Sequence, residues 1–218
     1  YVKKVGFNGE NIFRTSGLLS LKNVLEYPIV INNNKSFSIG ITTDDASRGT
    51  AERFVQYLMY SFASDAKKSD IRFRCADKEK GGQSYGKFIG LIGTNKLFGK
   101  GIYSNETAID EMITELNKIA EENVAELKGR YNSVYEYNKE NSKKIPVTLA
   151  VFCDAADYSY SRSKEELSKV LKNAQSSAIS TIFLSSSNNA GVFTNADEQL
   201  HITFENNTAF LRENNIKI

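Results

Sequence analysis

Apolar residues recur along the chain with the spacings of two kinds of element. Strands are predicted at SFSIGIT (36–42), DIRFRCAD (70–77), PVTLAVFCD (146–154) and AISTIFLSS (178–186), and the apolar character of the last two predicts strands that are buried in the sheet. Between these stretches, apolar residues three or four positions apart predict helices over 51–64 and 106–128, the second with Ser104 or Asn105 as its N-cap. Ser163 and Glu166 form a capping box that predicts another helix.

The alternation of strands and helices predicts the fold class. It favours βαβ units, and therefore a three-layer α/β fold whose central sheet is mainly parallel. Two further apolar stretches, QLHITFE and TAFLRE, are joined by two asparagines and predict a C-terminal β-hairpin. Ligands of such sheets bind beyond the carboxyl ends of the strands. Here these ends are 42–50, 76–85, 153–160 and 185–190.

Residues 1–35 differ from the rest, being rich in Asn, Gly and Lys around one apolar island. We expect them to be a lead-in segment that packs on a single domain formed by 36–218. The chain starts at Tyr1 rather than Met, so we expect it to be part of a longer protein. Any membrane anchor would then lie outside it, because no apolar run here approaches the roughly 20 residues that span a bilayer.

Composition narrows the chemistry. The formal net charge is +2, with 28 basic and 26 acidic residues, so no overall field attracts nucleic acid. His201 is the only histidine and there are two cysteines, too few for a structural zinc site with four such ligands. The same scarcity argues against Ser-His-Asp or Cys-His catalysis, because no other imidazole is present to act as the base. We expect Cys75 and Cys153 to be buried reduced thiols, and we expect no metal site.

One stretch has the setting of a phosphate-binding loop. TTDDASRGTAERFVQYLMYSF (42–62) follows a predicted strand and enters a predicted helix. Placing Gly49 on the last glycine of such a loop puts Thr50 at its lysine position and Ala51 at its hydroxyl position, while Asp44 replaces the first glycine. A shift of one residue puts Gly49 at the lysine position and Thr50 at the hydroxyl position. Neither alignment supplies the lysine that contacts the β- and γ-phosphates.

Charge in this loop also opposes a nucleotide. Asp44 and Asp45 place negative charge where a triphosphate would lie. Arg48 supplies a cation, but it precedes the lysine position, and its planar guanidinium is not equivalent to an ammonium group. The alternative is a strand–helix turn that binds no ligand, in which Thr50 caps the helix.

Four blocks of sequence resemble the FtsK/SpoIIIE-type P-loop motor ATPases. They are the loop and helix at 43–62, IRFRCADKEKGGQSYGKFIGL (71–91), the long helix and strand at 103–158, and EELSKVLKNAQSSAISTIFLSS (165–186). The resemblance covers about residues 28–205, and the order and spacing of the blocks carry it. It implies a RecA/FtsK-like P-loop NTPase fold.

Within that family, the eroded motifs look most like the last ATPase module of the type VII secretion coupling proteins, the EssC/EccC family. Those proteins are membrane-anchored chains of several such modules. The resemblance implies a site on the cytoplasmic side of a bacterial membrane and contacts to neighbouring ATPase modules. It also implies recognition of secreted WXG100-type substrates and a possible hexamer of the full-length protein, with membrane association only through segments outside this chain.

The resemblance aligns CDAAD, residues 153–157, with the family's DEFAD motif. Cys153 then stands at the position of the aspartate associated with Mg²⁺, and a thiol is a poor ligand for this hard cation. Asp154 stands at the position of the catalytic glutamate, or else is a strand-end carboxylate that holds a neighbouring loop. Ser185 and Ser186 lie where the family often keeps γ-phosphate sensors, although such serines are also common in turns and caps.

Two surface features have open interpretations. A basic group could contact DNA or a neighbouring subunit, or form a solvated rim; it comprises Arg72, Arg74, Lys78 and Lys80. A tyrosine set could form a docking surface, although packing roles are the commoner explanation; it comprises Tyr57, Tyr60, Tyr131, Tyr135 and Tyr137.

The lost motif positions predict a degenerate ATPase. Contacts to charged groups contribute about 1.5–3 kcal/mol each, so losing two or three weakens binding by about two to six decades. We therefore expect a module without catalytic residues or cofactor, binding ATP and Mg²⁺ at most weakly and acting in substrate recognition and interdomain coupling. The alternative is an active dsDNA-translocating ATPase with an unconventional phosphate loop. A third hypothesis is nucleotide binding without cleavage, which would regulate the assembly of neighbours.

Overall fold

The chain forms two sheets of very different size. The computed structural model describes residues 2–5, 29–32, 35–64, 70–91, 96–154, 163–186, 199–206, 208–213 and 216–217. Within the expected lead-in segment, β1 (Val2–Val5) and β2 (Ile29–Asn32) pair antiparallel as a small separate sheet. Most of residues 1–35 lies outside the described residues, so the packing of this segment on the domain stays a prediction.

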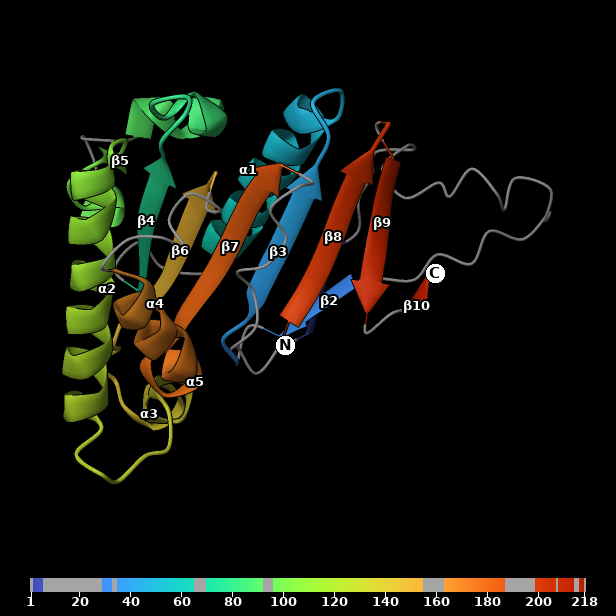
Figure 1. Ribbon diagram of the computed structural model, residues 1–218. Coiled ribbons are helices and arrows are strands. Elements are labelled where there is room, and N and C mark those ends of the chain that lie inside the picture. The colour runs from blue at the N-terminus through green and yellow to red at the C-terminus, as the bar shows by residue number, and fades with distance from the viewer. Residues whose placement is uncertain are drawn as a thin grey trace.

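The main sheet has eight strands. In spatial order they are β10 (Ile216–Lys217), β9 (Thr208–Glu213), β8 (Gln199–Glu205), β3 (Ser38–Thr43), β7 (Ile179–Ser186), β6 (Val147–Cys153), β4 (Ile71–Asp77) and β5 (Ile102–Tyr103). The strands from β8 to β5 are parallel, whereas β9 and β10 are antiparallel. The arrowheads of β3, β4, β6, β7 and β8 therefore point to one edge (Figure 1). The mainly parallel sheet and the terminal hairpin are both confirmed.

Helices cover both faces of this sheet. One face packs against α1 (Arg48–Ser64) and the 3₁₀ segments η1 (Gln83–Leu91) and η2 (Lys96–Phe98). The other packs against α2 (Glu106–Glu126), α4 (Ser163–Lys172) and the short α5 (Ala174–Ser177), with α3 (Val134–Glu140) at their lower end (Figure 1). The chain therefore has the three-layer α/β architecture that the alternation of elements predicts.

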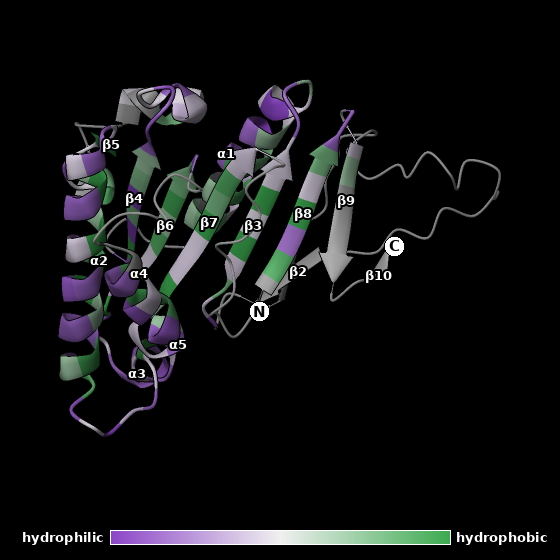
Figure 2. Ribbon diagram, in the orientation of Figure 1, coloured by the Kyte–Doolittle hydropathy of each residue, from purple (hydrophilic) through white to green (hydrophobic). Residues whose placement is uncertain are grey.

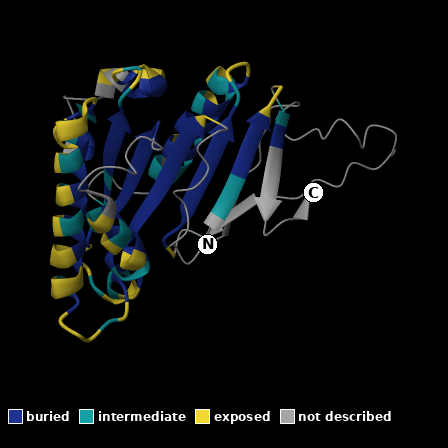
Figure 3. Ribbon diagram, viewed as in Figure 1, coloured by how far each residue is buried: buried dark blue, intermediate teal, exposed yellow. Residues whose placement is uncertain are grey.

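Burial on both faces explains the continuous apolar runs. All six residues of β3 and the first seven of β7 are buried, and β3, β6 and β7 appear dark blue in Figure 3. On the α1 side, Ile39 and Ile41 belong to the same core cluster as Phe54. On the α2 side, Phe152 and Phe183 stack with ring centroids 5.0 Å apart. Figure 2 shows the same division, with apolar strands inside and a polar outer face on α2.

The two long helices begin after polar N-cap residues. Asn105 caps α2, because its side chain accepts a hydrogen bond from the backbone N–H of Ala108 at 2.9 Å. The first helix begins at Arg48, three residues before the predicted start. The carbonyl of Ser47 accepts from the N–H of Ala51 at 3.0 Å, so Ser47, and not Thr50, is the N-cap.

Two helical segments were not predicted, because their sequences lack a long run of apolar residues at helical spacing. The Gly-rich stretch after β4 continues into η1, where the Tyr85 side chain is fully buried. Helix α3 is only seven residues long and is capped by Ser133, whose hydroxyl accepts from the N–H of Glu136 at 3.2 Å. Short helices of this kind depend on caps and packing, which periodicity does not reveal.

The basic group is not a solvated rim throughout. Arg74 is only 7% exposed, and its guanidinium donates to Glu115 at 2.8 Å and to the carbonyl of Phe73 at 2.7 Å. Gly99 has a φ of +58°, and a Cβ there would lie 2.8 Å from the guanidinium carbon of Arg74. The rim interpretation is therefore wrong for Arg74, which is an internal ion-pair residue.

The tyrosines divide between packing and exposure. The ring of Tyr135 is buried, and Tyr131 and Tyr137 form an edge-to-face pair with centroids 5.3 Å apart. Tyr60 is 65% exposed on α1. Among the described helices, none is long and apolar enough to cross a bilayer.

Candidate functional site

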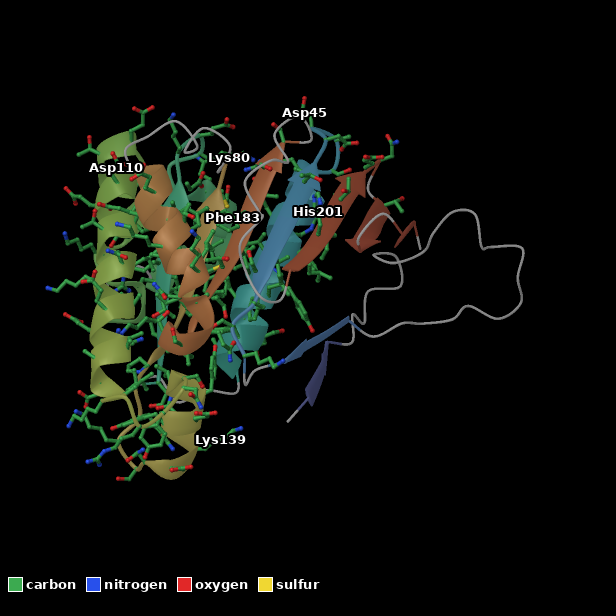
Figure 4. All side chains as sticks on the ribbon, turned by 60° about the horizontal axis from the view of Figure 1, so that its bottom comes forward. Asp45, Lys80, Asp110, Lys139, Phe183 and His201 are labelled. Atoms are coloured by element: carbon green, nitrogen blue, oxygen red, sulfur yellow. The ribbon has the colours of Figure 1, made fainter. Side chains whose placement is uncertain are left out.

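The predicted site residues gather at the carboxyl edge of the parallel strands. This edge contains the β3–α1 turn, the loop after β4, the end of β6, the end of β7 and the β8–β9 turn. Figure 4 shows Asp45 and Lys80 at this end of the molecule and Lys139 at the opposite end. The sequence therefore placed the candidate loop on the correct edge, and the contacts within it decide what it can do.

Asp44 bonds to backbone N–H groups of two turns at this edge. Its carboxylate accepts from the N–H of Ser47 at 2.7 Å and from the N–H of Asn206 at 2.9 Å. Hydrogen bonds from the Ser47 side chain and from these two N–H groups hold the pKa of Asp44 below its ordinary value. The turn after β3 is thereby tied to the turn after β8, and its N–H donor has an internal partner.

Arg48 and Asp154 form a bidentate ion pair across the edge. The two terminal guanidinium nitrogens donate to the two carboxylate oxygens at 2.7 and 3.0 Å. The side chains are 15% and 6% exposed, so water screens the pair poorly. Asp154 holds this position with a φ of +65°, a backbone conformation that Asp tolerates better than most residues. Its own N–H donates to the carbonyl of Leu184.

Glu52 extends the ion pair to the loop after β4. One of its carboxylate oxygens accepts from Arg48 Nε at 2.8 Å and from Lys80 Nζ at 2.7 Å, and Ser84 Oγ lies 3.3 Å away. Burial by itself would raise the pKa of Glu52, but the bonds from Arg48 and Lys80 outweigh it and lower the pKa. Burial likewise opposes the charge of Arg48, yet its hydrogen bonds to Asp154 and Glu52 raise its pKa. We call Arg48, Glu52, Lys80 and Asp154 the edge ion network.

Asp77 fixes the loop that carries Lys80. Its buried carboxylate accepts from the N–H of Lys80 at 3.1 Å, of Gly82 at 2.9 Å and of Ser84 at 3.1 Å. Gly82 has a φ of +101°, which a side chain would strain. Asp77 is therefore a loop anchor, and its oxygens are already used.

Cys153 points into the apolar core on the α1 side. It is fully buried in the same core cluster as Leu184 and Cys75, and neither cysteine forms a disulfide. Burial raises the pKa of Cys153 to about 12 and that of Cys75 well above its ordinary value. Both remain protonated at neutral pH, and buried reduced thiols are what the sequence predicts.

The serines at the end of β7 have different environments. Ser185 is 1% exposed and its hydroxyl has no hydrogen-bond partner in the described part of the chain, whereas Ser186 is exposed. The neighbouring Ser187 lies outside the described residues. Next to Ser185 on β3, Thr42 Oγ1 lies 3.0 Å from Thr203 Oγ1 and 3.3 Å from His201 Nε2.

The remaining loop residues do not converge on one point. Asp45 and Gly49 are exposed, and Thr50 Oγ1 accepts from Arg53 at 3.0 Å. Ala51 is completely buried in the core beneath α1. The described residues contain no group of three or more His, Cys, Asp or Glu side chains arranged to hold a metal ion.

Sequence reasoning missed Glu52 as a site residue, did not place Lys80 at the site, and missed Asp77. The spacing of Arg48 and Glu52 on a helix was a usable signal, because residues four apart share a face. Asp77 directly before a Gly-rich loop was another. Nothing in the sequence around Lys80 indicated its contact with α1, because that contact joins residues 28 positions apart.

Comparison with solved structures identifies the fold. Residues covering 88% of this chain superpose on 40% of EssC (ATPases 2 and 3) from Geobacillus thermodenitrificans, with a TM-score of 0.65 and 12% identity. The cytoplasmic domain of the Thermomonospora curvata type VII secretion ATPase EccC matches at a TM-score of 0.60 and 12% identity, over 80% of this chain and 21% of that one. Thermomonospora curvata EccC (ATPases 2 and 3), in complex with a signal sequence peptide, matches at 0.57 and 11%, over 82% and 31%.

The chain thus has the fold of the ATPase modules of EssC and EccC, and the predicted P-loop NTPase-like class is confirmed. It spans less than half the length of each of these solved chains. No family model and no curated protein matches the sequence.

The buried ion pair generates the first prediction. We expect Arg48→Ala to lower the free energy of unfolding by about 3–5 kcal/mol, because it leaves the carboxylate of Asp154 buried without its cation. Arg48→Ala/Asp154→Ala should lose much less, since no unpaired charge remains. Urea denaturation of the single and double variants measures both. The exposed pair of Lys118 and Glu122 provides the control, and Lys118→Ala should cost about 0.5 kcal/mol or less. Equal losses in the single and double variants would contradict a coupled pair.

The lowered pKa of Glu52 generates the second prediction. In the unfolded chain this carboxyl takes up a proton near its ordinary pKa of 4.5, while in the folded chain it stays ionised to lower pH. The unfolded state therefore binds more protons in this range, and Glu52 contributes stability that is lost as the pH falls below about 4.5. We expect Glu52→Gln to be less stable than the wild type at pH 7 and to lose less stability between pH 5 and pH 3. Denaturant titrations at the two pH values test this, and equal losses in both proteins would refute it.

Proposed function

We propose that this chain is a pseudo-ATPase module of a membrane-anchored type VII secretion motor, which acts in substrate recognition and interdomain coupling rather than in hydrolysis. The fold of EssC and EccC modules supports the context. The single observation that carries the loss of hydrolysis is the bidentate pair of Arg48 and Asp154. It engages the one cation of the β3–α1 turn and the one carboxylate at the catalytic position with each other.

The residues present do not fit a magnesium nucleotide. Binding a triphosphate would require Arg48 to leave Asp154, and Asp154 is too buried to remain charged without a partner at low cost. The hydroxyl position is either Ala51, which lies in the core, or Thr50, which accepts from Arg53. A protonated Cys153 offers Mg²⁺ no oxygen ligand.

The partners follow from the context of the fold. An EccC fragment of this fold has been solved with a signal sequence peptide, which supports a peptide-binding role for this chain too. We propose WXG100-type secreted proteins as substrates and the neighbouring ATPase modules of the same motor as partners, in an assembly that becomes hexameric in the full-length protein. The module would work on the cytoplasmic side of the bacterial membrane.

Calorimetry with Mg-ATP tests the loss of nucleotide binding. We expect no binding tighter than about 1 mM, because two or three charged contacts of about 1.5–3 kcal/mol each are missing. An ATPase with an intact lysine-bearing loop, titrated in parallel, shows that the assay detects a working site. A micromolar dissociation constant, or phosphate release that double-stranded DNA stimulates, would contradict the proposal and favour the translocating ATPase.

Peptide titration tests the recognition role. We expect a labelled signal peptide from a WXG100 protein to bind the chain with the same affinity in the presence and absence of Mg-ATP. Fluorescence anisotropy measures the affinity, and a scrambled peptide of the same composition is the control. Binding that requires nucleotide, or equal binding of the scrambled peptide, would contradict recognition by a nucleotide-independent module.

A further inference from the structure

At the carboxyl edge, two cations and two backbone N–H groups are bound by carboxylates of the chain itself. Arg48 is held by Asp154 and Glu52, and Lys80 is held by Glu52. The N–H groups of Ser47 and Asn206 are held by Asp44.

These bonds join segments that are far apart in the sequence. Asp44 ties the β3–α1 turn to the β8–β9 turn, 162 residues away. Asp154 ties α1 to the end of β6, 106 residues away. Glu52 ties α1 to the loop after β4, which Asp77 fixes in turn. The β3–α1 turn and the first turns of α1 are therefore together bonded to three other segments of the same edge.

The charges at the edge do not balance. Two cations pair with two carboxylates in the edge ion network, and Asp44, the exposed Asp45 and the buried Asp77 add negative charge to the same edge. A polyanion approaching the edge therefore meets cations that are already neutralised and a net negative field.

We propose that Asp44, Glu52 and Asp154 are an intramolecular substitute for a bound polyphosphate. They form an autoinhibitory contact that holds the loops of this edge together and excludes anions from it. This inference rests on the proposed function and deepens it, because it states what occupies the site in place of a nucleotide. A neighbouring module would then meet an edge whose shape does not change with nucleotide.

If these carboxylates block an anion site, removing their charges should allow an anion to bind. Glu52→Gln/Asp154→Asn keeps the shapes of both side chains and removes two negative charges, which releases Arg48 and Lys80. The probe is inorganic pyrophosphate, titrated by calorimetry and by the shift in Tm. We expect the double variant to bind pyrophosphate at least about tenfold more tightly than the wild type, because charge-assisted contacts become available. Pyrophosphate should raise the Tm of the variant and leave that of the wild type unchanged.

Two further variants show where the pyrophosphate binds. Adding Arg48→Ala to the double variant should abolish the gain. Glu126→Gln releases Lys143 at the opposite end of the molecule, where the pair is exposed, and should give no gain. Circular dichroism checks that every variant is folded, and Asp154→Asn alone serves if the double variant does not fold.

The outcomes separate this inference from the proposed function. A folded double variant that binds pyrophosphate no more tightly than the wild type would show that the carboxylates do not replace a polyphosphate. Tighter binding that persists after Arg48→Ala would show the same. Either result would leave the pseudo-ATPase proposal intact. Pyrophosphate binding by the wild type as tight as that of the variant would overturn this inference as well. Tight Mg-ATP binding by the wild type would instead contradict the proposed function itself.

Discussion

The ion pair between Arg48 and Asp154 is the constraint on which the arrangement of the candidate site depends. It connects the first turn of α1 to the end of β6, although β7 lies between β3 and β6 in the sheet. A bidentate guanidinium–carboxylate contact fixes both distance and orientation. Two side chains of α1 therefore reach neighbouring segments, because Arg48 binds the end of β6 and Glu52 binds Lys80 in the loop that follows β4.

Polar groups concentrate at this edge because of the way that a parallel sheet is built. The interior of the sheet is apolar on both faces, with Ile41 and Leu184 toward α1 and Phe152 and Phe183 toward α2. The turns therefore lie at the strand ends, where backbone N–H and C=O groups have no partner within the sheet. Such groups require hydrogen-bond partners when they are buried. Asp44 and Asp77 supply such partners from within the chain.

The scaffold and the chemistry of the site are separable in energetic terms. The stability of the fold resides in the double-faced core, and Ala51 and Cys153 are part of that core. The turns at the carboxyl edge are instead held by hydrogen bonds and ion pairs of Asp44, Glu52, Asp77 and Asp154. The core and the polar contacts of the candidate site therefore lie in different parts of the molecule.

The sequence by itself determined the architecture. The apolar runs predicted four of the central strands within two residues of their observed bounds. Helical spacing predicted α1 and α2, and the order of elements predicted the parallel sheet and the edge where the site lies. The strands and helices are local features, because the spacing of apolar residues indicates which faces of an element are buried. The parallel sheet follows from the order of these elements along the chain. Short capped segments such as η1 and α3 were not predictable in this way, since packing decides them.

Only the tertiary structure decided which charges neutralise each other. The sequence showed Arg48 and Asp154 as separate candidates, and Arg74 and Lys80 as members of one basic group that could contact DNA or a neighbouring subunit or form a solvated rim. The fold brings Arg48 to Asp154 and Lys80 to Glu52, and it buries Arg74 against Glu115. These pairings depend on distances between segments that lie far apart along the chain, 106 residues for Arg48 and Asp154, and no local pattern encodes such a distance.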